Sequence, residues 1–144
     1  MKRGSKIISI DPRYTWMSTR ADYHLQIRPG TDGALALAML NVIIDEGLYD
    51  KEFVDKWTYG FDKLKERVQH YPVDKVAEIT WVPADQIQAA ARMFATETPS
   101  CAMEGMGVAH QPNSYGAIAA RHIISAIVGN VDVKGGEELL GPAP

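Results

Sequence analysis

The stretch Lys6-Ile7-Ile8-Ser9-Ile10-Asp11-Pro12-Arg13 decides the fold. Its β-branched residues predict a short buried strand, which ends at Asp11 because a residue before proline avoids the helical region of the backbone. Residues 21–27 alternate weakly between apolar and polar side chains, so they predict a second short strand. The run Ser100–Glu104 predicts a third strand.

Helical spacing of apolar residues fills the sequence around these strands. The first expected helix runs from Thr31-Asp32 to just before Gly47, and a second begins at Asp50. Three more are expected: one over 62–71, one that begins at Pro83, and one over Tyr115–Val128. Residues 73–80 are expected to form one helical turn and a loop. Alternating strands and helices predict an α/β fold: a three-layer, Rossmann-like domain with a short, mostly parallel sheet and helices on its faces. Three strands are few for such a sheet. Residues 1–144 are therefore expected to form a single α/β domain that belongs to a longer protein.

Composition excludes several classes of protein. Hydrophobic residues make up 46% and charged residues 23% of the 144 residues, which is typical of a globular domain and not of a disordered chain. The net charge of −3 gives no basic footprint for nucleic acid. No apolar stretch is long enough to span a membrane, and the run 7–10 is too short for a signal peptide. We expect a soluble segment without a targeting signal. The sequence does not predict its cellular compartment.

The segment Gly105-Met106-Gly107-Val108-Ala109-His110 is the first candidate site. It imitates the start of a G-x-G-x-x-G dinucleotide loop, but His110 replaces the third glycine and no acidic residue follows at the expected distance. A classical NAD site is therefore disfavoured. A glycine-rich turn without a ligand is the alternative that composition favours.

Two carboxylates supply further candidates. Asp11 and Arg13 follow the first strand, where α/β sheets bind ligands, and an arginine there can clamp a phosphate. Asp32 follows Gly30-Thr31 at the start of a helix, where its carboxylate could accept both N1–H and N2–H of a guanine. The alternatives are a surface turn with an Asp–Arg pair for Asp11, and a simple helix cap for Asp32.

The histidines and the single cysteine offer less. His122 is expected to be a satisfied core residue and His70 a solvated one, which leaves His110 as the functional candidate among the histidines. Cys101 is expected to be an inert, buried thiol. No nucleophilic triad or carboxylate pair can be placed, so catalytic residues remain unassigned and no metal ligand is predicted.

Taken in order, the motifs resemble the molybdopterin oxidoreductases of the dimethyl sulfoxide reductase superfamily. Each motif is weak alone, but the ordered set runs from end to end of the chain. The matching segments are Lys6–Arg13, Thr15, Ala21-Asp22, Ile27–Asp32, Val42–Ile44, Leu48–Asp50, Phe53-Val54, Gly60-Phe61, Ile87, Ala90–Arg92, Gly105–Val108, Arg121, Gly129–Val131 and Gly135-Gly136. The longer run 109–113 is similar to the branch that contains acetylene hydratases and hydroxyl-transfer enzymes.

That resemblance implies a central α/β domain of a much longer enzyme that binds molybdenum or tungsten through two molybdopterin guanine dinucleotides. The metal ligand and an iron–sulfur domain would lie upstream of this segment. Asp11, Arg13, Gly30, Thr31 and Asp32 would line one guanosine diphosphate pocket. Gly105, Met106, Gly107 and His110 would approach the cofactor or the substrate funnel.

The segment alone is expected to be inactive and to bind no cofactor. Its expected partners are the remaining domains of the same polypeptide and an electron-transfer subunit, with neither nucleic acid nor membrane. Two other functions fit the residues: a freestanding purine-nucleotide-binding module, and a structural or assembly domain without a ligand site.

Overall fold

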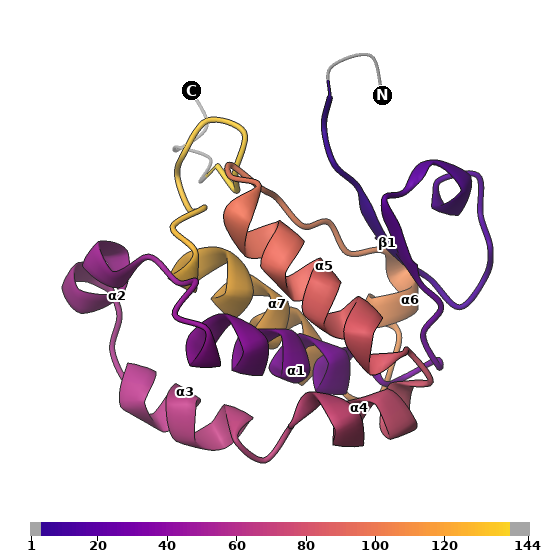
Figure 1. The fold of residues 1–144 in the computed structure, drawn as a ribbon, viewed down its shortest axis with the longest axis horizontal. Coiled ribbons are helices and arrows are strands. Elements are labelled where there is room, and N and C mark those ends of the chain that lie inside the picture. Colours follow the sequence, from indigo (N-terminus) through magenta and orange to yellow (C-terminus); the bar gives the residue numbers. More distant parts are fainter. Residues whose placement is uncertain (1–3, 139–144) are drawn as a thin grey trace.

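A computed structural model describes residues 4–138 and shows a mixed α/β fold. Two short strands, β1 (Ile8–Ile10) and β2 (Tyr23–Leu25), pair in parallel with Ile8 opposite Tyr23 and Ile10 opposite Leu25. The 3₁₀ turn η1 (Ser18–Arg20) lies in the loop that connects them. The strands stand at one side of the helices (Figure 1). Two of the expected strands and their parallel pairing are confirmed.

The helices follow the sequence pattern closely. They are α1 (Asp32–Asp45), α2 (Lys51–Trp57), α3 (Phe61–Val68), α4 (Val73–Thr80), α5 (Ala84–Thr96), α6 (Met106–Ala109) and α7 (Ser114–Ile127). Asp50 caps α2 as expected, because its Oδ1 accepts a hydrogen bond from the Phe53 N–H at 2.9 Å. Helix α4 is two turns long, where the sequence predicted one turn and a loop.

Two helices end at a glycine with the same pair of backbone hydrogen bonds. After α1, the Gly47 N–H bonds to the Ile44 carbonyl and the Leu48 N–H to the Ile43 carbonyl, with Gly47 at φ 65°. After α7, Gly129 repeats this pair of bonds at φ 72°. Both ends are Schellman motifs, in which a left-handed residue satisfies the last carbonyls of the helix.

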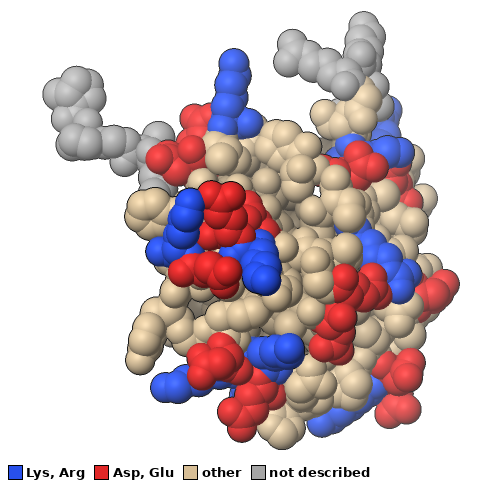
Figure 2. All heavy atoms as spheres, turned by 60° about the vertical axis from the view of Figure 1, so that its left-hand side comes forward, with Lys and Arg blue, Asp and Glu red and all other residues tan. Residues whose placement is uncertain are grey.

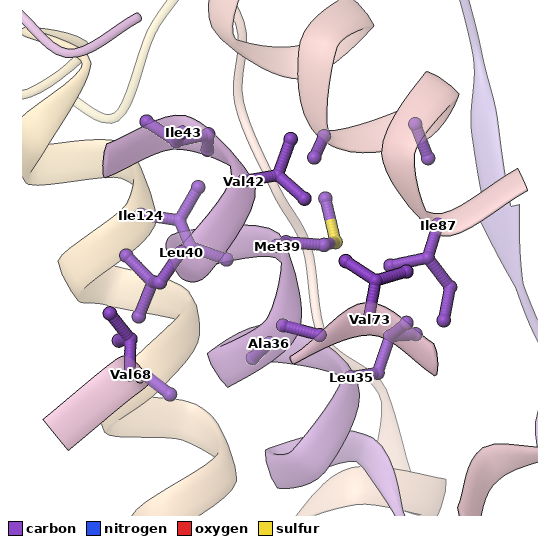
Figure 3. Close-up of a cluster of buried hydrophobic side chains, with 14 of the residues drawn as sticks. Leu35, Ala36, Met39, Leu40, Val42, Ile43, Val68, Val73, Ile87 and Ile124 are labelled. Atoms are coloured by element: carbon purple, nitrogen blue, oxygen red, sulfur yellow. The ribbon is translucent and has the colours of Figure 1, made fainter. Parts of the chain in front are cut away.

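Helix α1 forms the centre of the core. It packs against α3, α4, α5 and α7, and all its residues from Ala38 to Ile44 are buried. Figure 3 shows Leu40 beside Val68 and Ile124, and Leu35 near Val73 and Ile87. Asn41 is a buried polar residue of this helix, and its Nδ2 donates to the Val68 carbonyl at 3.2 Å, which ties α1 to the end of α3.

The prediction of a third strand was wrong for the described chain. Ser100–Glu104 pairs with no strand, and the sheet within residues 4–138 has two strands. A strand needs a hydrogen-bonding partner, which an apolar run does not supply by itself. Cys101 is exposed, contrary to the buried thiol expected there.

The surface carries both signs of charge. On the face that Figure 2 shows, lysine and arginine alternate with aspartate and glutamate instead of forming one basic expanse. No helix of residues 4–138 is long and apolar enough to cross a membrane.

Candidate functional site

Asp11 and Arg13 form a closed turn at the end of β1. The Arg13 N–H donates to Asp11 Oδ1 at 2.7 Å, and Arg13 Nε lies 3.6 Å from the same oxygen. The Asp11 N–H bonds to the Leu25 carbonyl, so the turn is fixed to the end of β2. The Arg13 side chain is 83% exposed and free to reach an anion. The two residues predicted to act together do lie together.

Gly30, Thr31 and Asp32 connect β2 to α1. Gly30 has φ 82°, in the left-handed region that favours glycine. A Cβ built on Gly30 would lie 3.4 Å from Gln111 Oε1, so this turn contacts the loop before α7. Thr31 is the N-cap residue, but its Oγ1 donates to the Arg28 carbonyl at 2.7 Å and makes no capping bond.

Asp32 is the first helical residue of α1, and neither it nor Thr31 caps the helix through its side chain. Burial raises the pKa of the Asp32 carboxyl, and its own backbone N–H offsets this effect only in part. A half-buried carboxyl without a strong partner costs stability when it ionises. The guanine-binding role and the capping role of Asp32 both stay predictions.

The glycine segment contains a one-turn helix where the sequence predicted a glycine-rich turn. Gly105 is the N-cap residue of the one-turn helix α6, and His110 follows its end. Between Gly105 and His110, Val108 alone is half-buried; Met106, Gly107 and His110 are exposed.

A cavity of about 550 Å³ lies between β1 and helices α1, α5 and α7. Apolar side chains of α1 and α5 line it together with polar and charged residues, and Asp32 and Gly105 belong to this lining. Among the nine predicted site residues, these two are the ones that line it. A second hollow of about 630 Å³ is lined by Pro12 and Pro29, which adjoin the other candidates, together with Tyr14, His24 and Trp81.

Sequence reasoning missed a charged cluster at the cavity. Arg121 Nη2 lies 2.6 Å from Glu104 Oε2, and Arg121 Nη1 lies 2.5 Å from Glu137 Oε1. Ser125 Oγ donates to Glu137 Oε1, and His122 Nδ1 lies 3.2 Å from Glu137 Oε2. His122 is therefore an exposed residue that contacts Glu137, and not the core residue expected. Arg121, His122 and Ser125 lie together on α7, but Glu104 and Glu137 lie outside that helix on either side, so helical spacing does not join the carboxylates to it.

Residues 4–138 contain no group of three or more His, Cys, Asp or Glu side chains that could hold a metal ion.

Parallel strands whose carboxyl ends meet the start of a buried helix form an arrangement in which α/β proteins bind ligands. The sequence matches the family described as Molybdopterin oxidoreductase over residues 1–140, and the chain belongs to this family. The resemblance found in the sequence motifs is thus confirmed.

Individual relatives agree with this assignment. The chain is 53% identical to an acetylene hydratase of Syntrophotalea acetylenica over 141 residues, which cover 98% of this chain and 19% of the relative. It is 36% identical to formate dehydrogenase H of Escherichia coli over 130 residues, 90% of this chain and 18% of the relative. The solved structure of acetylene hydratase from Pelobacter acetylenicus matches with a TM-score of 0.87 and 55% identity, covering 89% of this chain and 18% of that one. The chain therefore spans about a fifth of the length of these relatives.

Proposed function

We propose that residues 1–144 are a single α/β domain of a longer molybdenum or tungsten enzyme, and that this domain contributes to binding one molybdopterin guanine dinucleotide. Family membership and the 19% share of the acetylene hydratase relative support this proposal. In the longer protein, β1 and β2 would be part of a three-layer, Rossmann-like arrangement. Upstream segments would supply the metal ligand and an iron–sulfur cluster, and the remaining domains of the same polypeptide would be the partners of this domain.

Asp32 is the observation that carries the proposal. Its carboxyl is half-buried at the start of α1, makes no capping bond and has a raised pKa because of burial. Guanine presents two adjacent donors, N1–H and N2–H, that would each donate a hydrogen bond to this carboxylate. Adenine has an acceptor at N1 and no N2 amine, so it would leave the charge unpartnered, which costs more than losing a neutral hydrogen bond.

The neighbouring residues fit the other parts of a dinucleotide. The exposed Arg13 guanidinium, held at the end of β1 through Asp11, would bind phosphate. Gly30 and Thr31 leave the backbone at the start of α1 open to a planar base. Gly105, Met106, Gly107 and His110 lie on or beside α6 and would face the cofactor or the substrate path. When bound, the cofactor supplies the sulfur atoms that ligate molybdenum or tungsten.

Among branches of the family, we propose that of acetylene hydratase for the full-length protein. Identity to the Syntrophotalea relative is 53%, whereas identity to two F420-dependent formate dehydrogenase subunits is 35% and 38%. The reaction of the longer protein would then be hydration of a small unsaturated substrate.

The test compares Asp32→Asn with the full-length protein that contains this segment. Asn keeps the shape but replaces one acceptor oxygen with a donor amide, and it also suits a helix start. We expect a well-folded variant that retains about a tenth or less of the guanine nucleotide released per chain on denaturation. Asp62→Asn, at the exposed first turn of α3, is the matched control and should load normally.

Normal guanine content in folded Asp32→Asn would refute the role of this carboxylate. If the natural reading frame closed immediately on both sides of the segment, the rival purine-nucleotide module would replace the proposed enzyme domain.

A further inference from the structure

The segment 101–110 packs against α7 through α6. Within residues 4–138, the ion pairs of Glu104 are the only ion pairs that join this segment to another element. Helix α6 inside it has four residues. A helix of one turn is unstable by itself, because nucleation fixes several residues for very few hydrogen bonds. Its position must therefore come from contacts with other elements.

Arg121 provides such a contact at the start of α6. It projects from α7, and its Nη2 lies 2.6 Å from the carboxylate of Glu104, the residue directly before the N-cap Gly105. Both side chains are largely buried, with 19% of Arg121 and 27% of Glu104 exposed. An ion pair screened from water in this way is stronger than a surface pair.

The other half of the Arg121 guanidinium is held by the C-terminal turn. Glu137 forms an isolated parallel bridge with Val131, and its N–H and carbonyl bond to Asn130 and Asp132. Its carboxylate receives Arg121, Ser125 and His122 together. Burial alone raises the pKa of the Glu137 carboxyl, but the hydrogen bonds from Ser125 and Arg121 outweigh it and leave that pKa below its ordinary value. Glu137 is thus ionised over the whole neutral range.

We infer that Arg121 is a positioning residue that holds the glycine segment 104–110 against α7 and couples it to the C-terminal turn 131–137. The ion pair of Arg121 with Glu104 fixes the start of α6. The ion pair of Arg121 with Glu137 fixes the guanidinium itself. The inference rests on the proposed function in one respect: 104–110 is the segment proposed to face the cofactor. A change in the C-terminal turn would then alter the cofactor site without touching it.

Amide hydrogen exchange of the full-length protein measures this coupling directly. The α6 bonds from Val108, Ala109 and His110 N–H are the reporters. We expect Arg121→Gln to speed exchange about fivefold in both 104–110 and 131–137, which corresponds to a lost ion pair of moderate strength. Glu104→Gln should speed exchange in 104–110 alone. Glu137→Gln should speed it in both segments, because an unanchored Arg121 holds Glu104 less well.

Arg92→Gln is the matched control. Arg92 pairs with Glu46 through two nitrogens, far from α6, so its loss should leave exchange in 104–110 unchanged. If Arg121→Gln fails to fold, Glu104→Gln and Glu137→Gln still decide the question. Unchanged exchange in 104–110 in folded Glu137→Gln would overturn the coupling, and unchanged exchange in folded Glu104→Gln would overturn the positioning role.

Cofactor content separates this inference from the proposed function. Guanine nucleotide per chain should fall in Arg121→Gln and stay normal in Arg92→Gln. A wild-type protein that carries no guanine nucleotide would refute the proposed function, whereas the exchange result would still confirm or refute the coupling.

Discussion

Asp32 occupies a position at which an acidic side chain ordinarily stabilises a helix, yet it makes no capping bond there. Its raised pKa has a thermodynamic consequence. A carboxyl whose pKa is raised in the folded state favours folding while it is protonated, and this contribution is lost as the pH rises through the folded pKa. The wild-type carboxylate is therefore a source of instability at neutral pH that a ligand would relieve.

We predict that Asp32→Asn gains stability relative to the wild type as the pH rises from about 3 to about 7. The amide does not ionise, so the variant escapes the cost of a buried charge. Urea unfolding at several pH values measures the difference. Asp62→Asn, at an exposed position in the first turn of α3, is the control and should show no such gain. A parallel response of the two variants would contradict the account of Asp32.

At the scale of elements, the ends of α1 and α7 offer a matched pair of glycines. Gly47 and Gly129 both have a positive φ in a Schellman motif. A Cβ on Gly47 would meet nothing within 4 Å, whereas a Cβ on Gly129 would lie 2.7 Å from Asp50 Oδ2. The same Asp50 carboxylate caps α2.

We predict that Gly47→Ala costs about 1 kcal/mol of unfolding free energy, the penalty of a left-handed residue with a Cβ. Gly129→Ala should cost about 1 kcal/mol more, because Asp50 must move and its cap on α2 weakens. Chemical unfolding of the two variants gives the difference. Equal costs would show that Asp50 moves aside freely.

Local signals explain which elements were predictable. Asp11-Pro12 stops β1, Gly47 and Gly129 stop helices, and Asp50 starts one, all through backbone chemistry within a few residues. The run Ser100–Glu104 has the composition of a strand but no partner strand. The sequence of one segment does not specify which other segment it pairs with. For the same reason the sequence grouped Asp11 with Arg13 but did not reveal the contact of Arg121 with Glu104 and Glu137.

At the scale of the whole molecule, α1 connects the site to the rest of the fold. Its first residue, Asp32, faces the cavity, and its middle is surrounded by four other helices (Figure 1). A helix that is buried on all sides has no polar face. The apolar spacing of 32–45 therefore predicted a helix, but it could not predict which elements pack against which side of it. The position of the candidate site thus depends on packing along the full length of α1.

Leu40 tests this dependence. It is fully buried in the middle of α1, beside Val68 and Ile124 (Figure 3). We predict that Leu40→Ala lowers the unfolding free energy by about 2–5 kcal/mol, because truncation loses apolar burial and leaves a cavity. Trp57→Ala on the surface of α2, where the residue is 77% exposed, should change it by no more than about 0.5 kcal/mol. Chemical unfolding followed by circular dichroism measures both. A domain of this kind has only about 5–15 kcal/mol of stability. Leu40→Ala should therefore also destabilise the first turn of α1, which holds Asp32, and amide hydrogen exchange there should become faster. A loss confined to global stability, with exchange near Asp32 unchanged under native conditions, would show that the first turn of α1 is held independently of the core.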